Sequence, residues 1–388
     1  MDAVGDEGSE KSERRGSCGV SWKSVRVPWV TTALDAHRVS MMFKLSPDDL
    51  MLIALKEAAN CTEKVRPNPR VGAAIELLSG EVISGFHPQA GGPHAERVVL
   101  AECQKRNLKT QGARMAITLE PCSHTGKTPP CTEALLQAGI AEVVIPFLDP
   151  NPLVKGQGVE CLKKQNVKVL EGTRKSEAYL LNREWLWAQK LQRPYFSLKM
   201  ATSSNHVWKK KDGDPWITSL AARMHAMNLR AKVDCLLTSG QTVRDDNPAL
   251  TVRLENGDLA ERQPDVAILT RQTHFAVKGK LLEHPAMVSV YDWKNLGEGL
   301  QQLFSNKKYL NVMLEAGPRL SRDFLIEGCV DEVWRYVHQQ PLPGAIENLL
   351  PLLQRNLTLS QKIKIDEDDS LEIWIHKERD EKNYFARL

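Results

Sequence analysis

Apolar and polar positions along the chain predict an ordered succession of helices and strands. Residues 46–60 have apolar side chains at helical spacing, and Ser46 followed by Pro47 and two aspartates is a typical helix start. Further helices are predicted at 91–103, 132–140 and 158–164, and strands at 71–77, 81–86, 113–120, 141–147 and 167–172. Helices that alternate with apolar strands in this way predict a three-layer α/β domain.

A second α/β domain is predicted after a connecting helix at 174–192. Strands are expected at 194–201, 234–240, 265–270, 311–317 and 331–338, helices at 219–232 and 321–328, and a period-two hairpin at 362–377. The first forty residues are small, polar and charged, which is typical of disorder. We therefore expect a disordered N-terminal extension at 1–45, a first domain at 46–190 and a second at 191–388.

Composition narrows the class of protein. The 388 residues are 42% apolar, enough for two or three domains with cores of their own. The 52 basic and 48 acidic residues give a net charge of +4, which is too even to favour a nucleic-acid partner. No apolar run approaches the roughly 18 residues of a membrane span. The eight cysteines mostly stand singly, which favours a reducing, cytoplasmic compartment over a disulfide framework.

One constellation has the residue types of a metal centre. His94 and Glu96 form an HAE triplet, and Cys122 and Cys131 follow at a C-x8-C spacing. One imidazole and two thiolates are the three protein ligands of a catalytic zinc, which keeps its fourth position for water. Glu96 can then shuttle protons without binding the metal. The order matches the zinc deaminase signature H-x-E…P-C-x-x-C with a longer cysteine spacing. The alternative, a structural zinc, needs a fourth ligand, for which His124 is the obvious candidate.

The first domain resembles the family of bifunctional riboflavin-biosynthesis deaminase/reductases. The stretches that carry the resemblance are PNPRVGA, HAE, TLEPCSHTGKTPPC and DPNPLVKGQG. It implies a cytidine-deaminase-like fold and a small-molecule substrate, a diaminopyrimidinone with a ribosylamino 5-phosphate. It also implies phosphate contacts at Lys127 and His124, and further substrate contacts at Asn68, His87, Asp149 and Asn151. A turn remains an alternative role for Asn68, between two prolines, and for the segment 149–152.

The second domain resembles the reductase of the same family, which has a dihydrofolate-reductase-like α/β fold and uses NADPH. The matching stretches are LKMA, WITS, LRAKVD, TSGQTVRDDNPALTVR and LEAGP. The resemblance implies dinucleotide contacts at Ala201, Trp216, Thr242, Asp246 and Gly317, and substrate contacts at Arg230, Leu250, Arg253 and Glu315. An arginine suits a sugar phosphate and a helix start at Gly317 suits the cofactor phosphate. The alternatives are that helix arginines are solvated charges and that Trp216 belongs to the core.

Two departures from the family pattern concern the reductase. Asn205 and His206 replace an Asp-Gly pair, and the stretch QQPLPGA replaces a later Gly-Gly pair. The other polar positions remain in register, so we still expect a working NADPH reductase.

The prediction is a bifunctional enzyme that first deaminates the pyrimidine with zinc and then reduces its ribosyl group with NADPH. Neither nucleic acid nor membrane is expected as a partner, and the oligomeric state, a homo-oligomer included, is left open. Three alternatives remain: a deaminase with a degenerate reductase domain, a nucleoside or nucleic-acid deaminase, and a non-catalytic zinc-containing ligand sensor.

Overall fold

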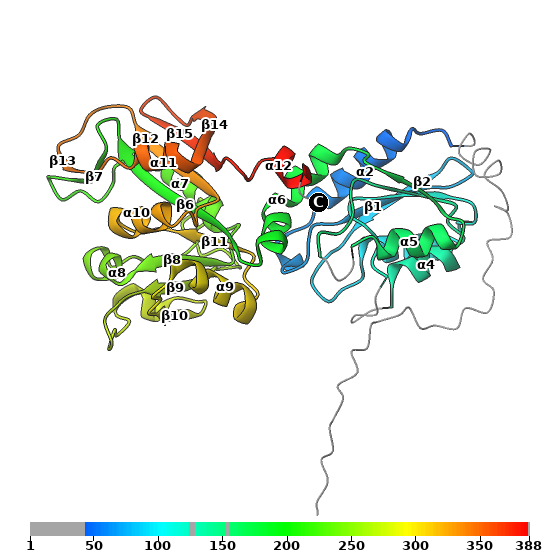
Figure 1. Cartoon of the computed structure of the whole chain (residues 1–388), viewed down its shortest axis with the longest axis horizontal. Helices are drawn as coiled ribbons and strands as arrows, with labels where there is room; N and C mark the ends of the chain where they lie inside the picture. Colours follow the sequence, from blue (N-terminus) through cyan, green and yellow to red (C-terminus); the bar gives the residue numbers. More distant parts are fainter. Residues whose placement is uncertain (1–42, 124–128, 152–154, 387–388) are drawn as a thin grey trace, which may run out of the picture.

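Two α/β bodies joined by a long helix make up the chain (Figure 1). This computed structural model describes residues 43–123, 129–151 and 155–386. The predicted N-terminal extension lies almost wholly outside the described residues. The two predicted α/β architectures are confirmed, and their sheets are separate.

The first body is built on a five-stranded sheet of order β2-β1-β3-β4-β5. Strand β1 is antiparallel to both of its neighbours, whereas β3, β4 and β5 run parallel. Every residue of β1, β3 and β4 is buried, as expected for apolar strands covered on both faces. The strands are β1 (Gly72–Glu76), β2 (Val82–Phe86), β3 (Arg114–Ile117), β4 (Glu142–Ile145) and β5 (Lys168–Glu171).

Helices cover both faces of this sheet. Neighbouring side chains of a strand point to opposite faces, so Ile75 joins one core and Ala74 the other. The Ile75 core is shared with α3 (Ala95–Lys105), α4 (Cys131–Gln137) and α5 (Gln157–Lys164). The Ala74 core is shared with α2 (Pro47–Ala59), α6 (Lys175–Leu191) and the C-terminal α12 (Glu381–Ala386). The result is the predicted three-layer arrangement.

The second body has an eight-stranded sheet of order β10-β9-β8-β11-β6-β12-β15-β14. The first six strands in this order, which are β10, β9, β8, β11, β6 and β12, run parallel to one another. Strands β15 and β14 add the predicted antiparallel hairpin at the β12 edge. The strands are β6 (Tyr195–Ser203), β8 (Cys235–Ser239), β9 (Asp265–Leu269), β10 (Val288–Tyr291), β11 (Asn311–Leu314), β12 (Glu332–His338), β14 (Leu357–Lys364) and β15 (Asp369–His376). A small separate sheet pairs β7 (Val207–Lys210) with β13 (Gly344–Ile346).

Helices also lie on both faces of the second sheet. Leu229 of α7 (Leu220–Arg230) packs with Met313 and Tyr336 on one face. The opposite face carries α9 (Leu296–Lys307), α10 (Pro318–Ile326) and α11 (Leu350–Asn356). The short helix α8 (Gly240–Asp246) follows β8 directly, so it begins at the carboxyl end of that strand.

The connecting helix α6 is where the end of the chain returns to the first body (Figure 1). Trp187 is buried, and its Nε1 donates a hydrogen bond of 2.9 Å to the Tyr179 hydroxyl. The ring of Tyr384 in α12 meets the Trp187 ring edge-on at 5.2 Å. Asn182 interrupts the helix with a φ of −122°, which divides α6 into two segments.

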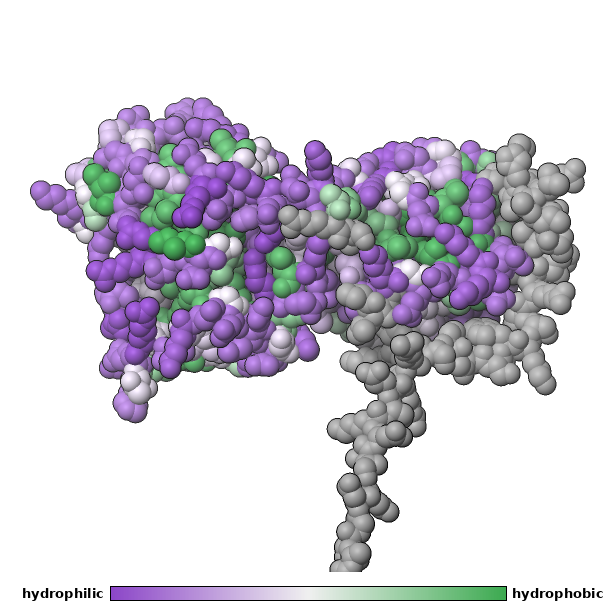
Figure 2. All heavy atoms as spheres, in the orientation of Figure 1, coloured by the Kyte–Doolittle hydropathy of each residue, from purple (hydrophilic) through white to green (hydrophobic). Residues whose placement is uncertain are grey.

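The visible face of both bodies carries mostly hydrophilic residues, with apolar residues in small patches between them (Figure 2). Within the described part of the chain, no helix has the length and apolar character needed to cross a bilayer.

Candidate zinc site and reductase site

Three metal-ligating side chains converge at the starts of two helices. His94 is the N-cap residue of α3, Cys131 is the first residue of α4, and Cys122 follows β3. Nδ1 of His94 lies 3.6 Å from Sγ of Cys122 and 3.3 Å from Sγ of Cys131. The three donor atoms all lie within 4.8 Å of one another. The fold therefore gathers the three predicted ligands into one site.

The separations of these atoms fit a zinc ion. A tetrahedral zinc with bonds of about 2.1 Å to nitrogen and 2.3 Å to sulfur places such donors roughly 3.5 Å apart. The backbone N–H of Cys131 donates to Sγ of Cys122 at 3.3 Å, and the hydrogen bond from the Cys131 thiol lowers the pKa of the Cys122 thiol. Among the described residues, no further His, Cys, Asp or Glu joins the group. The donor set thus suits a zinc that keeps one position for a reactant.

Glu96 lies in the first turn of α3, outside the ligand group. Its side chain is only 3% exposed. Burial is the main reason why the pKa of its carboxyl is raised, and the sulfur of Cys122 adds to the effect. A buried carboxyl beside the metal ligands can accept a proton and return it during the reaction. Its position and environment therefore suit the predicted proton shuttle.

Asn68 and His87 lie beside the metal ligands. Nδ1 of His87 is 2.9 Å from the carbonyl oxygen of Pro93, and its Nε2 is 3.1 Å from Nδ2 of Asn68. A carbonyl only accepts, so Nδ1 carries the proton and Asn68 donates to Nε2. Burial lowers the pKa of His87, which keeps the ring neutral in this role. The rings of His87 and His94 meet edge-on at 5.5 Å, so Asn68 is oriented next to the ligand group.

Glu120 organises the segment after the ligand loop, and the sequence analysis did not identify it. It is 6% exposed and stands two positions before Cys122. Its two carboxylate oxygens accept hydrogen bonds of 2.9–3.1 Å from the backbone N–H groups of Asp149, Gly156, Gly158 and Val159. The available signal was a carboxylate at the end of a predicted buried strand, where it requires partners.

The structure shows the predicted substrate residues Asp149 and Asn151 within a turn. Oδ1 of Asp149 accepts the backbone N–H of Asn151 at 2.8 Å, which is the geometry of the turn alternative. The predicted phosphate contacts His124 and Lys127 lie outside the described residues.

In the second body, Arg230 and Glu315 are brought together, but they bind each other. Nε and Nη2 of Arg230 lie 2.6 and 2.9 Å from the two carboxylate oxygens of Glu315. Nζ of Lys199 lies 3.7 Å from the same carboxylate. Burial opposes ionisation of Glu315, yet Arg230 and Lys199 outweigh it and hold its pKa at about 2. Burial also lowers the pKa of Lys199, an effect that Glu315 partly offsets.

Lys199 is a residue that the sequence analysis missed, although it lies in the LKMA stretch that carried the resemblance. A lysine in a strand has no local signal of burial or pairing. Only the parallel pairing of β6 with β11, which places Ser197 opposite Met313, reveals that Lys199 and Glu315 share one face of the sheet.

Thr242 and Gly317 meet where two neighbouring parallel strands end. They follow β8 and β11, and the backbone N–H of Gly317 donates to Oγ1 of Thr242 at 3.4 Å. Gly317 is the N-cap residue of α10, and a Cβ added there would meet no atom within 4 Å. Carboxyl ends of parallel strands that lead into helices are where open α/β sheets bind dinucleotide phosphates. The pair therefore fits the predicted NADPH site.

The other predicted reductase residues vary in exposure. Trp216 is 55% exposed beneath the Arg223 guanidinium, 4.2 Å from the ring centroid, so the core alternative for Trp216 is wrong. Ala201 is partly buried on β6, and Asp246 is exposed at the end of α8.

Arg230 also contacts the segment that contains Leu250 and Arg253, the two remaining predicted substrate residues. Its Nη1 donates to the carbonyl of Thr251 at 3.1 Å. The neighbouring Leu250 is 4% exposed, and its side chain packs in the core. Arg253 is exposed and donates to the carbonyl of Gly257 at 2.9 Å.

The replaced Asp-Gly pair has a clear structural consequence. His206 adopts a φ of +65°, the left-handed conformation that glycine reaches without steric cost. Nδ1 of His206 lies 3.3 Å from Nη2 of Arg335. Oδ1 of Asn205 accepts from Ser203 and from the backbone of Leu342, so Asn205 links this turn to the loop before β13.

Comparisons with known proteins match both halves of the chain. Residues 46–146 match the cytidine and deoxycytidylate deaminase zinc-binding region, and residues 194–342 match the RibD C-terminal domain. The riboflavin biosynthesis protein RibD of Aquifex aeolicus is 34% identical over 73% of this chain and 84% of that protein. The RibD of Escherichia coli K12 is also 34% identical, over 78% and 90%. The solved structure of Acinetobacter baumannii RibD, form 1, matches with a TM-score of 0.75 at 32% identity, covering 85% of this chain and 99% of that one.

The fold and its two sites define a two-domain enzyme in which a zinc-dependent deaminase is joined to a reductase. The match to a characterised family covers most of the chain. The chain belongs to the RibD family, the bifunctional deaminase/reductases of riboflavin biosynthesis. The predicted bifunctional deaminase/reductase is thereby confirmed, and so is the predicted zinc, because the zinc-binding deaminase region coincides with the His94, Cys122 and Cys131 group.

Proposed function

We propose that the first domain removes an amino group from a diaminopyrimidinone bearing a ribosylamino 5-phosphate, and that the second domain then reduces the ribosyl group to ribityl. A solved relative from Thermotoga maritima, with 28% identity and a TM-score of 0.75, is described as a diaminohydroxyphosphoribosylaminopyrimidine deaminase and 5-amino-6-(5-phosphoribosylamino)uracil reductase. The observation that carries the proposal is the His94, Cys122 and Cys131 group with buried Glu96 outside it.

The deaminase residues have distinct roles in this proposal. His94, Cys122 and Cys131 hold zinc, which when bound supplies Lewis-acid activation of the attacking water. Glu96 takes the proton that the nucleophile loses and delivers it to the departing amine nitrogen. The raised pKa of its carboxyl suits it to hold that proton between the two transfers.

Substrate positioning falls to the residues around the ligand group. His87 orients the amide of Asn68 toward the site, where it can hydrogen-bond the pyrimidine ring. Lys127 and His124 remain proposed phosphate contacts on the basis of the sequence alone. The turn at Asp149 and Asn151, held through Glu120, is the proposed far wall of the pocket.

In the reductase, NADPH supplies the hydride that reduces C1 of the ribosyl group. Lys199 is the proposed proton donor to the sugar oxygen, because burial lowers the pKa of its ammonium beside Glu315. Arg230 is engaged by Glu315 and acts as a positioning residue for that carboxylate. Arg253 contacts a carbonyl and, among the described residues, no carboxylate, so its charge is available for the substrate phosphate.

We also propose that residues 46–190 carry the deaminase and residues 191–388 the reductase, with α12 returning to the first body. All described cysteines are free, which supports a reducing, cytoplasmic location.

The experiment that tests the function supplies the diaminopyrimidinone phosphate to the zinc-loaded chain. Without NADPH we expect ammonia and the deaminated ribosyl product, and with NADPH the ribityl product, identified by mass spectrometry. A zinc-loaded chain that releases no ammonia from this substrate would contradict the proposal.

A further inference from the structure

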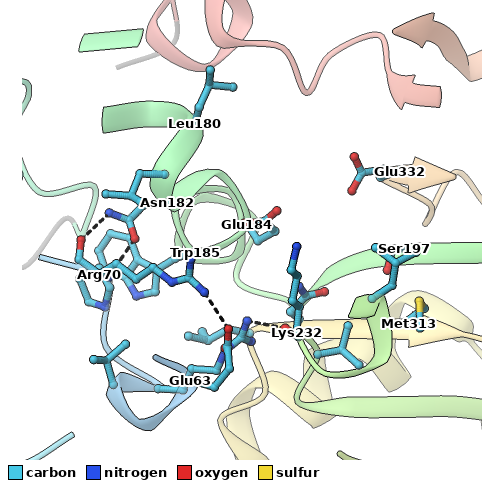
Figure 3. A pocket seen from close by; sticks show the side chains of 18 of the residues that line it. Glu63, Arg70, Leu180, Asn182, Glu184, Trp185, Ser197, Lys232, Met313 and Glu332 are labelled. Atoms are coloured by element: carbon cyan, nitrogen blue, oxygen red, sulfur yellow. Dashed lines mark hydrogen bonds and ion pairs between the residues drawn. The ribbon is translucent and has the colours of Figure 1, made fainter. Parts of the chain in front are cut away.

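The segment that carries Asn68 is fixed at its far end by the connecting helix. Oδ1 of Asn182 accepts the backbone N–H of Arg70 at 2.9 Å, and Nδ2 of Asn182 donates to the carbonyl of Arg70 at 2.8 Å (Figure 3). Asn182 is 5% exposed and is the residue at which α6 leaves helical geometry. The side chain of Arg70 also binds Glu63 at 2.7 Å, which closes the segment on itself.

The near end of the same segment is fixed by the second domain. Arg66 follows the short helix η1 (Glu63–Val65) and stands two positions before Asn68. Its Nη1 lies 3.0 Å from Oδ1 of Asp234, and its Nη2 donates to the carbonyl of Lys232. Asp234 and Lys232 belong to the turn between α7 and β8. A residue of the deaminase thus depends on an acceptor in the reductase.

Asp234 is an ordered acceptor. Its Oδ2 accepts the backbone N–H groups of Leu310 at 2.8 Å and Asn311 at 3.0 Å, at the start of β11. The side chains of Arg66 and Asp234 are only 21% and 10% exposed. Because Asp234 is already fixed, its pair with Arg66 loses less conformational entropy on forming than a pair between two mobile surface side chains. Because both side chains are shielded from solvent, salt screens the pair less than it screens a surface pair.

Packing does not hold the segment on the side that faces the second domain. A cavity of about 350 Å³ lies there, with Asn68, Pro69 and Arg70 on one wall and Ser197 and Met313 on another. Figure 3 shows Glu63 and Arg70 across this space from Ser197 and Met313. Polar contacts at the two ends of the segment therefore set its position.

We propose that Asp234 of the reductase domain is a positioning residue for deamination, acting through Arg66 on the segment that presents Asn68. The proposal rests on the proposed function of the first domain. Asp234 binds Arg66, and the backbone joins Arg66 to Asn68 two positions later. Asn68 then contacts His87 at 3.1 Å, and the His87 ring contacts the His94 ring. The fusion of the two domains thus completes the deaminase pocket.

The chain offers a closely matched control. Arg262 binds the same carboxylate oxygen of Asp234 at 3.1 Å and donates to the carbonyl of Ala231, as Arg66 does to that of Lys232. Arg262 comes from the second domain, and no described contact links it to the Asn68 segment. Arg66→Met and Arg262→Met therefore remove equivalent contacts on Asp234, and only Arg66 lies on the path to Asn68. Arg66→Met also removes the ion pair of Arg66 with Glu63, so Asp234→Asn is needed to isolate the contact with Asp234.

The test measures ammonia release from the diaminopyrimidinone phosphate by the zinc-loaded full chain. For Arg66→Met we expect KM to rise roughly tenfold with little change in kcat, because misplacing a binding group weakens substrate binding. Zinc content and reductase KM should remain as in the wild type. Arg262→Met should leave the deaminase KM unchanged.

A second pair of variants separates positioning from a loss of folding. Arg66→Lys keeps the charge and should give a smaller rise in KM than Arg66→Met. Asp234→Asn should raise KM by itself but add nothing in the Arg66→Met background, because the contact between Asp234 and Arg66 is already lost there. A wild-type KM in Arg66→Met, or an equal rise of KM in Arg262→Met, would overturn the inference. The proposed function would still stand in either case, provided that the wild-type chain releases ammonia. An inactive wild type would instead overturn the proposed function.

Discussion

Arg230 and Glu315 are joined by two parallel hydrogen bonds of 2.6 and 2.9 Å, in the bidentate geometry that guanidinium and carboxylate favour. Family resemblance implies that both residues contact the substrate, whereas the structure directs each toward the other. The pair faces Lys199, whose Nζ is 3.7 Å from Glu315. The carboxylate therefore balances two partly buried cations and raises the pKa of the lysine against the effect of burial.

The pH profile of the reductase tests this effect. Glu315 raises the pKa of Lys199 against the lowering effect of burial. A lysine that donates a proton must be protonated, so activity falls as the pH rises through its pKa. Glu315→Gln removes the supporting charge and should shift this basic limb to lower pH. NADPH oxidation with the deaminated intermediate measures the profile, and Glu327→Gln on the surface is the control. A basic limb at the wild-type position would contradict the role of the pair.

The turn at His206 provides a test by stability. His206→Gly removes the left-handed strain, whereas His206→Ala keeps it, and both lose the contact with Arg335. The glycine variant should be more stable than the alanine variant by about 1 kcal/mol. Urea unfolding of the two variants side by side measures the difference. An alanine variant at least as stable as the glycine variant would show that the turn carries no such strain.

Glu120 should be essential to the stability of the first domain. In Glu120→Gln only one side-chain atom can still accept, so backbone N–H groups after the ligand loop lose their partner at a cost of about 1–3 kcal/mol each. We expect a lower melting temperature of the first domain. Glu160→Gln is the control, because Glu160 is an exposed residue of α5 whose Lys164 contact is a surface pair. Equal melting temperatures for the two variants would count against the four-amide arrangement.

The order of most elements and the three metal ligands could be predicted from the sequence, because apolar periodicity and the HAE and cysteine spacing are local signals. Helix α9 escaped prediction because Gly297 and Gly299 lower its helix propensity. The difficulty at His206 could be identified from the family pattern, because glycine at that position indicates a backbone conformation that other residues adopt at a steric cost.

The contacts between the domains could not be predicted. Arg66 and Lys232 are 166 positions apart, and nothing near either residue indicates the other. Asn182 leaves helical geometry inside α6 and binds the backbone of Arg70. Such a tertiary contact can override the local preference for helix, and the local sequence does not indicate it. The burial of Glu120 had a signal in the sequence, but its partners had none, because the backbone amides that it binds become neighbours only in the folded domain.

Cys131→Ala tests whether Cys131 is a zinc ligand. Loss of one thiolate should release zinc and lower the stability of the first domain, since metal binding and folding are coupled. Reductase activity with the deaminated intermediate should persist. Metal analysis that finds a full complement of zinc in this variant would contradict the ligand assignment.

The most direct test of the central claim is ammonia release by Glu96→Gln with its zinc content measured in the same sample. Glu96 lies outside the ligand group, so the variant should hold zinc at the wild-type ratio. Its amide cannot carry the proton from nucleophile to leaving amine, so ammonia release should fall by at least about 100-fold, the usual scale of general acid–base catalysis. Retained zinc with wild-type ammonia release, or loss of zinc from this variant, would contradict the account.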